Sequence, residues 1–200
     1  MKQIILFFLV FVSGCSSSVP QLPPLSPDSV ILAFGDSLTY GTGVSEDDAY
    51  PAVLEQLTGF SVINAGIPGE ETPQGLKRLP QLLEEYKPAL LVLCHGGNDI
   101  LRKRDLKKTV ENIKSMINIA KQQGISVVLL GVPEFGLLLS AAEFYPQIAQ
   151  ELNIPFDGET IPDIESDNAL KSDAIHPNKA GYRIMAEAVM TLLKQSGAIQ

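Results

Sequence analysis

Residues 30–38 read Val-Ile-Leu-Ala-Phe-Gly-Asp-Ser-Leu, and this stretch decides the fold. Five apolar residues follow one another without alternation and stop at a turn-forming Gly-Asp-Ser. Such a run is typical of a strand buried on both faces of a parallel sheet. Because ligands of open α/β sheets bind at the carboxyl ends of the strands, Ser37 is expected where chemistry takes place. Asp36 and Ser37 could instead cap the next segment, and this stretch alone leaves both interpretations open.

The rest of the chain alternates between predicted strands and predicted helices. Further apolar runs predict four more strands, at residues 61–64, 89–94, 127–130 and 154–156. Apolar residues at helical spacing predict helices between them, at residues 50–57, 76–86, 106–120 and 141–152. A last helix has a predicted apolar face made of Ile184, Met185, Ala188, Val189, Leu192 and Leu193. Pro80 predicts a kink or a restart in its helix. The alternation predicts an α/β domain whose central parallel sheet of about five strands is covered on both sides.

Composition and charge narrow the class of protein. Of the 200 residues, 45% are hydrophobic and 19% are charged, which is typical of one globular domain. The formal net charge of −8 argues against a nucleic-acid partner, because phosphate backbones are bound by clustered Lys and Arg. No group of Cys, His and carboxylate residues has the spacing of metal ligands, and no complete dinucleotide fingerprint is present. We therefore expect neither a metal nor a cofactor.

The N-terminus predicts export and lipid anchoring. Lys2 is followed by an apolar run at residues 4–12, which is too short to span a bilayer and is typical of a signal peptide covering residues 1–14. The sequence Val-Ser-Gly-Cys ending at Cys15 resembles the bacterial lipobox, in which the cysteine is lipidated; an incidental cysteine beside an ordinary cleavage site is the alternative. Residues 15–28 then predict a lipidated, Pro- and Ser-rich tether, and residues 29–200 the domain. The residue after Cys15 is Ser16 and not Asp. By analogy with Gram-negative lipoproteins, this indicates sorting to the outer membrane, at its periplasmic face.

Two histidines are available as a general base for Ser37. A serine hydroxyl becomes a good nucleophile only when a base takes its proton and a third group orients that base. His176 lies three residues after Asp173, so a turn could bring the carboxylate to the imidazole. A surface loop in which both residues cap helices remains an alternative. His95 has no nearby acid in the sequence and is interpreted as a structural residue beside the site.

Donors for a developing oxyanion are predicted at the ends of the first three strands. The backbone N–H groups of Ser37 and Gly69 and the side-chain amide of Asn98 could supply three hydrogen bonds. Asn98 taken alone would more often be a turn residue.

Four short blocks, in order and at suitable spacing, resemble those of the GDSL/SGNH hydrolases: Gly35-Asp36-Ser37-Leu38, the glycine loop up to Gly69, Gly96-Gly97-Asn98-Asp99 and Asp173-x-x-His176. The bacterial thioesterase I, lysophospholipase and arylesterase branch is the most similar. The resemblance implies a flavodoxin-like three-layer fold, with Ser37 as nucleophile, His176 as base and Asp173 as its orienting partner. It places Gly69 and Asn98 in the oxyanion hole. Because the glycine block varies within the family, Gly66 is an alternative to Gly69.

These features together predict a membrane-tethered serine esterase of the cell envelope. Its expected substrates are small acyl esters, thioesters or lipids, cleaved through an acyl-enzyme on Ser37. An O-deacetylase of envelope polysaccharide and a non-catalytic lipid- or glycan-binding lipoprotein are the alternatives. The four intact blocks argue against the binding protein, because binding needs no Ser-His-Asp set. Residues 135–139 could line an acyl groove or belong to the core, and the sequence leaves the oligomeric state open.

Overall fold

Five parallel strands form the central sheet in the computed structural model, which describes residues 19–134 and 140–200. Their order across the sheet is β2 (Ser61–Gly66), β1 (Val30–Gly35), β3 (Leu90–Cys94), β4 (Ser126–Leu130) and β7 (Phe156–Asp157). β3 is buried along its whole length and β1 at every residue except Val30, as the unbroken apolar runs predict. The predicted parallel sheet of about five strands is therefore confirmed.

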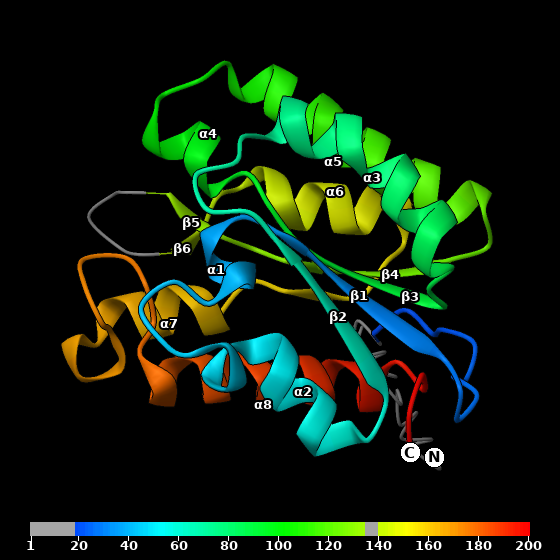
Figure 1. The fold of residues 1–200 in the computed structure, drawn as a ribbon. Coiled ribbons are helices and arrows are strands. Elements are labelled where there is room, and N and C mark those ends of the chain that lie inside the picture. Colours follow the sequence, from blue (N-terminus) through cyan, green and yellow to red (C-terminus); the bar gives the residue numbers. More distant parts are fainter. Residues whose placement is uncertain (1–18, 135–139) are drawn as a thin grey trace, which may run out of the picture.

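Helices cover both faces of this sheet and make the three layers seen in Figure 1. One face carries α3 (Thr72–Tyr86), α5 (Leu106–Gln122) and α6 (Phe144–Leu152). The other carries α2 (Tyr50–Thr58), α7 (Thr160–Ser166) and α8 (Lys179–Gln195). Shorter elements complete the described chain: α1 (Ser37–Tyr40), α4 (Gly97–Leu101), the 3-10 turns Glu46–Asp48 and Asn168–Leu170, and the antiparallel pair β5 (Pro133–Glu134) and β6 (Ser140–Ala141).

The register brings the ends of three strands level. Gly35, the last residue of β1, lies beside Gly66 of β2 and Cys94 of β3. A Cβ atom at Gly35 would come within 2.0 Å of the Cys94 carbonyl oxygen, so only glycine fits where the strands approach. The loops that follow β1, β2 and β3 therefore leave the sheet from one common edge.

Two predicted element boundaries are wrong around β6 and β7. The helix predicted from Ala141 begins only at Phe144, because Ala141 pairs with Pro133 in the β5–β6 hairpin. The strand predicted at residues 154–156 begins at Phe156. Ile154 still donates its N–H to the Ala149 carbonyl at the end of α6, so the chain reaches the sheet two residues later than the apolar pattern indicates.

Two predictions about helices are also affected. Pro80 lies inside α3, which continues through it, so a restart is excluded and a kink stays a prediction. Its position is exposed, so the carbonyl group that loses an N–H partner can turn toward water. Ile184 is 38% exposed and does not belong to the buried face of α8, whereas Tyr182 and Ala186 do.

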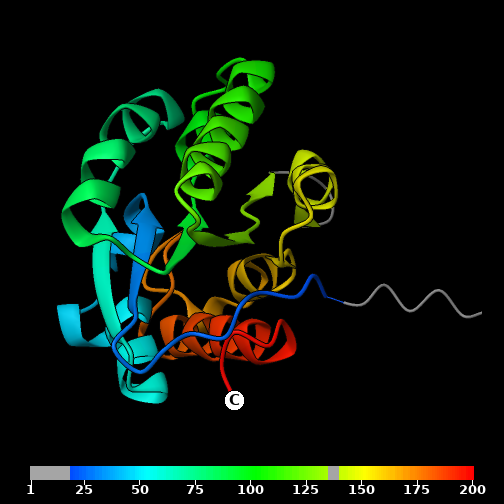
Figure 2. The same ribbon diagram turned by 90° about the vertical axis from the view of Figure 1, so that its right-hand side faces the viewer.

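The described part of the predicted tether lies along the C-terminal end of the chain (Figure 2). Leu22 N–H donates to the Ser196 carbonyl and Leu25 N–H to the Ala198 carbonyl, each at 2.8 Å. Both leucines pack against the core. Cys15, the predicted signal peptide and residues 135–139 lie outside the described residues. Within residues 19–134 and 140–200, no helix is both long and apolar enough to cross a bilayer.

Candidate active site

Ser37 is the first residue of α1, directly after β1. The preceding residue, Asp36, caps this helix: its Oδ1 accepts a hydrogen bond from the Leu38 N–H at 3.1 Å. The Ser37 hydroxyl instead lies 3.0 Å from Nε2 of His176. The sequence leaves open whether Asp36 and Ser37 cap a helix or take part in chemistry. In the structure Asp36 is the helix cap, and Ser37 contacts the histidine.

The turn from Asp173 to His176 is organised by the Asp173 carboxylate. Oδ1 accepts hydrogen bonds from the N–H groups of Ile175 and His176, both at 2.9 Å, and Oδ2 lies 2.7 Å from His176 Nδ1. Partial burial raises the pKa of Asp173, but the hydrogen bonds from Ile175 and His176 outweigh it and lower this pKa to about 2. The carboxylate is therefore ionised at neutral pH and can only accept hydrogen bonds.

An ionised Asp173 fixes the orientation and the tautomer of His176. Because Oδ2 must accept, Nδ1 carries the hydrogen, which leaves the Nε2 lone pair to accept from the Ser37 hydroxyl. Residues that are 139 positions apart in the sequence thus form one hydrogen-bonded chain of hydroxyl, imidazole and carboxylate. In this arrangement an imidazole can remove the hydroxyl proton as the oxygen attacks an acyl carbon.

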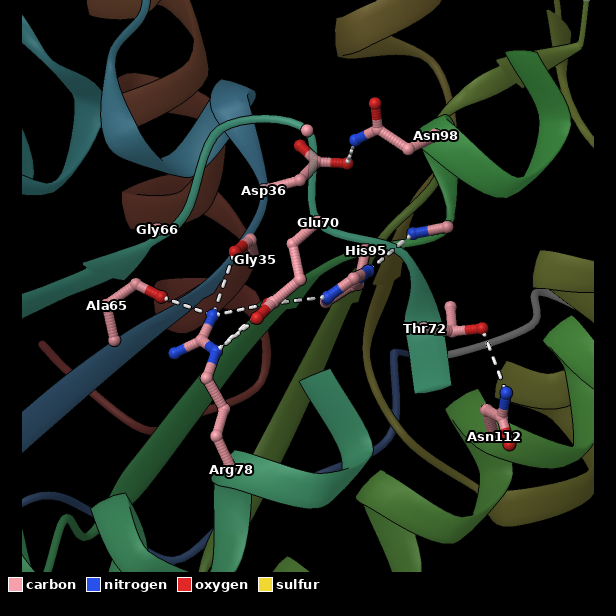
Figure 3. A network of polar contacts seen from close by, with 12 residues as sticks. Gly35, Asp36, Ala65, Gly66, Glu70, Thr72, Arg78, His95, Asn98 and Asn112 are labelled. Carbon is pink, nitrogen blue, oxygen red and sulfur yellow. Dashed lines mark hydrogen bonds and ion pairs between the residues drawn. The ribbon is translucent and has the colours of Figure 1, made fainter. Parts of the chain in front are cut away.

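Asn98 lies on the wall of the same pocket, on α4. Figure 3 shows its amide turned toward Asp36, and Asn98 Nδ2 donates to Asp36 Oδ2 at 3.1 Å. Burial raises the pKa of Asp36, while His95 and the hydrogen bonds from Leu38 and Asn98 act in the opposite direction. An amide nitrogen carries two hydrogens, so one remains for a group that enters the pocket.

The two candidate glycines differ in their surroundings. The Gly66 N–H donates to Asn64 Oδ1 at 3.0 Å, and a Cβ at Gly66 would lie 2.1 Å from the Tyr40 nitrogen. Gly66 therefore serves close packing. Gly69 has a φ of +75°, its carbonyl accepts from Arg102, and no described residue accepts from its N–H. Gly69 is not among the described residues that line the pocket at Ser37, so its part in an oxyanion hole stays a prediction.

A buried polar network ties the strand ends together behind the site (Figure 3). Arg78 Nη2 donates to the carbonyl of Gly35 at 3.1 Å and to that of Ala65 at 2.9 Å. The same guanidinium pairs with Glu70 at 2.7 Å, and Glu70 Oε2 lies 3.1 Å from His95 Nε2. His95 is fully buried, as its interpretation as a structural residue predicts. The network therefore holds the ends of β1, β2 and β3 to the loop that carries Gly69.

Sequence reasoning missed one polar residue of this pocket, Glu165. It lies on α7 and lines the pocket with Ser37, Asn98 and His176. Residues 160–166 form a short helix without a clear apolar period, so no local pattern marks Glu165 as buried. The pocket wall is completed by Asp36, Leu38, Gly97, Leu101, Val132, Pro133 and Ile175.

Comparisons with known proteins agree with this fold and identify the family. Residues 33–184 match the GDSL-like Lipase/Acylhydrolase family. Esterase TesA of Pseudomonas aeruginosa PAO1 is 31% identical over 198 residues, covering 92% of this chain and 97% of the relative. Thioesterase 1/protease 1/lysophospholipase L1 of Escherichia coli K12 is 30% identical over 169 residues, covering 78% and 79%. A crystal structure of TesA superposes with a TM-score of 0.73 at 28% identity, covering 83% and 98% of the two chains. The chain therefore belongs to the GDSL-like lipase/acylhydrolase family, as its four sequence blocks predict.

Proposed function

We propose that this chain is a serine esterase and thioesterase in which Ser37 is the nucleophile. The observation that carries the proposal is the hydrogen-bonded chain from Ser37 through His176 to Asp173, with distances of 3.0 Å and 2.7 Å. The names of its relatives, an esterase and a thioesterase with lysophospholipase activity, support small acyl esters, thioesters or lysophospholipids as substrates.

The reaction passes through a covalent acyl-enzyme. As the Ser37 oxygen attacks the acyl carbon, His176 Nε2 takes its proton and then gives that proton to the leaving alcohol or thiol. Asp173 stabilises the positive charge that His176 carries between these steps. A water molecule then attacks the acyl-enzyme with His176 again as the base, which releases the acid and restores the Ser37 hydroxyl.

Negative charge on the carbonyl oxygen requires donors that are already in place. We assign this role to the backbone N–H groups of Ser37 and Gly69 and to the second N–H of Asn98. Two contacts support the assignment. Arg102 donates to the Gly69 carbonyl and so holds that peptide in place, and Asp36 accepts from the Asn98 amide and so orients it.

Covalent labelling of the nucleophile tests the proposal. The wild-type chain should hydrolyse p-nitrophenyl esters or acyl thioesters, and a fluorophosphonate should label the peptide that contains Ser37. Ser37→Ala should lose both properties, whereas Ser45→Ala, a change at an exposed serine, should keep them. A wild-type protein that hydrolyses no ester, thioester or acetylated sugar, or that is labelled at another serine, would overturn the assignment.

We also propose that Cys15 is lipidated and anchors the protein in the cell envelope, at the periplasmic face of the outer membrane. The short apolar run and the small residues before Cys15 support this proposal. Expression in a Gram-negative host with a radioactive fatty acid should label the wild-type protein and not Cys15→Ala. Cys94 is buried, so Cys94→Ala is the matched control and should remain labelled. Equal labelling of wild type and Cys15→Ala would exclude this anchor.

A further inference from the structure

Glu165 is a buried carboxyl group that the proposed reaction does not use. It is 7% exposed, and the surface that it retains lines the pocket containing Ser37 and His176. α7 holds it there: Asp157, at the end of β7, accepts hydrogen bonds from the N–H groups of Glu159 and Thr160 and so fixes the start of this helix. The position of Glu165 is therefore set from β7 through the start of α7, and also by Lys171, which pairs with Pro177 directly after His176.

No described side chain donates a hydrogen bond to the Glu165 carboxylate. The nearest cation, Lys171, donates its Nζ to the backbone carbonyl of Glu165 at 2.6 Å. The carboxylate oxygens still reach the open pocket, so a ligand that enters it displaces water from them and must itself supply a hydrogen bond in its place.

The charges around Glu165 leave its ionisation balanced near neutral pH. Burial raises the pKa of Glu165, Lys171 opposes this and Asp36 adds to it, and the net result is a pKa of about 7. His176 lines the same pocket, and the Cys94 thiol is close enough to be affected by the Glu165 charge. α8, which packs against α7, carries its Lys and Arg side chains in exposed positions, and β6 has no titratable side chain.

We propose that Glu165 selects substrates with a hydroxyl group close to the scissile ester, by hydrogen-bonding that hydroxyl inside the pocket. This inference rests on the proposed esterase function and names the class of ester that the site prefers. A hydroxyl can donate to the carboxylate or accept from the protonated carboxyl, so it partners Glu165 in both of its states.

The remaining walls of the pocket favour a neutral hydroxyl over an ammonium group. Leu38, Leu101, Val132 and Ile175 are apolar, and at neutral pH Glu165 is only partly ionised, so an ammonium group among them would be incompletely paired, whereas a hydroxyl needs no counter-charge. A purely alkyl chain would leave Glu165 desolvated without a partner, so the site discriminates against it. A pocket built to bind a substrate hydroxyl rejects analogues that lack it.

Two matched pairs of esters test the proposal and locate the hydroxyl. p-Nitrophenyl 3-hydroxybutanoate is compared with p-nitrophenyl butanoate for the acyl side, and glycerol monobutanoate with propyl butanoate for the alcohol side. In at least one pair, wild-type kcat/KM should favour the hydroxylated ester by about tenfold or more after correction for intrinsic reactivity. Glu165→Leu should remove this preference. Glu165→Gln should retain part of it, because an amide also forms hydrogen bonds.

The pH dependence of the same ratio separates a binding role from a structural one. Both esters of a pair are cleaved with His176 as the base. Protonation of His176 therefore lowers kcat/KM equally for both and cancels in their ratio. The wild-type preference should increase from pH 6 to pH 8, because an ionised carboxylate binds a hydroxyl more strongly than its protonated form does, and the Glu165→Gln ratio should stay constant. Asp163→Asn, an acid-to-amide change at an exposed site on the same helix, should behave as wild type.

The outcomes distinguish this inference from the function on which it rests. Active enzymes whose ratios are the same for wild type, Glu165→Leu and Glu165→Gln in both pairs would overturn the role of Glu165 and leave the esterase intact. A wild-type protein that cleaves none of the four esters, with no loss in Ser37→Ala, would overturn the proposed function itself. If Glu165→Leu fails to fold, as judged by circular dichroism, the pH-independent ratio of Glu165→Gln decides the question.

Discussion

Two histidine–carboxylate pairs lie in this molecule, His95 with Glu70 and His176 with Asp173. In the first pair, Nε2 of His95 faces Glu70 and Nδ1 accepts from the Gly96 N–H at 3.0 Å, so the fold uses both nitrogens. In the second pair, Nδ1 of His176 faces Asp173, and Nε2 remains for the Ser37 hydroxyl. A carboxylate beside a histidine therefore does not by itself mark catalysis; the partner of the second ring nitrogen decides.

Burial separates the two pairs further. The Glu70 side chain is 5% exposed and also binds Arg78, whereas the Asp173 side chain is 52% exposed. Ionic contacts at the surface add little to stability, while breaking a buried pair is costly. We therefore expect substitutions in the His95 pair to lower stability and substitutions in the His176 pair to lower the rate.

The largest effect is expected from removal of His176. His176→Ala should lower kcat by on the order of 10⁴–10⁶, because His176 is the described side chain that is hydrogen-bonded to the Ser37 hydroxyl, and should change the melting temperature little. His95→Ala should have the opposite profile, with a lower melting temperature and a milder loss of kcat per folded molecule. Steady-state kinetics and thermal unfolding of both variants check this. A fully active His176→Ala, together with an inactive but folded His95→Ala, would reverse the two roles.

Asp173→Asn should be the next largest change. An amide in place of the carboxylate can hold His176 in the wrong tautomer, and the expected loss of kcat is on the order of 10³–10⁴. Glu70→Asp, which shortens a carboxylate in the other pair, is the matched variant and should lose far less. Equal losses of kcat in the two variants would mean that the distinction between the pairs is wrong.

Asn98→Ala tests the side chain proposed as a donor to the oxyanion. If its second N–H stabilises the oxyanion, kcat should fall by on the order of 10²–10³ with little change in KM. The melting temperature should also fall, because the buried Asp36 loses a hydrogen bond. Both quantities are measured on one preparation, and an unchanged kcat per folded molecule would remove Asn98 from the site.

Glu70→Gln should have the smallest effect of these variants. It should lower the free energy of unfolding by an amount that depends on pH. Burial raises the pKa of Glu70, but hydrogen bonds from His95 and Arg78 bring it below its ordinary value of 4.5. A lowered pKa in the folded state means that the ionised group stabilises the fold above pH 4.5 and that this contribution is lost as the pH falls. Wild type should exceed the variant by about 2 kcal/mol in free energy of unfolding at pH 7, and by less below pH 4.5. Urea unfolding at both pH values measures the difference, and a gap that widens in acid would contradict the prediction.

The sequence predicts much of this molecule because its signals are local. Unbroken apolar runs mark β1, β3 and β4, and the spacing of three residues from Asp173 to His176 marks the turn that one carboxylate closes. The gathering of Ser37 and His176 follows from a general rule, since the carboxyl ends of parallel strands share one edge of the sheet.

Other features depend on contacts between distant parts of the chain. Ala141 has no strand signal of its own and becomes part of β6 only because Pro133 lies opposite. Glu70 and His95 are 25 residues apart, and nothing in their neighbourhoods shows that they meet. Glu165 is of a residue type that is usually exposed at the surface, and it becomes part of the pocket only through the packing of α7. Tertiary placement of this kind leaves no periodic trace in the sequence.

The path of residues 19–28 has a consequence for orientation. They join the domain where β1 begins, whereas Ser37 and His176 lie where β1 ends (Figure 1). The six residues of β1 separate these two levels by roughly 20 Å. If the proposed lipid anchor at Cys15 holds the chain at a bilayer, the proposed nucleophile Ser37 would therefore lie on the side of the domain remote from that bilayer. Such an enzyme would meet esters that diffuse through the aqueous space more readily than lipids still embedded in the membrane that holds it.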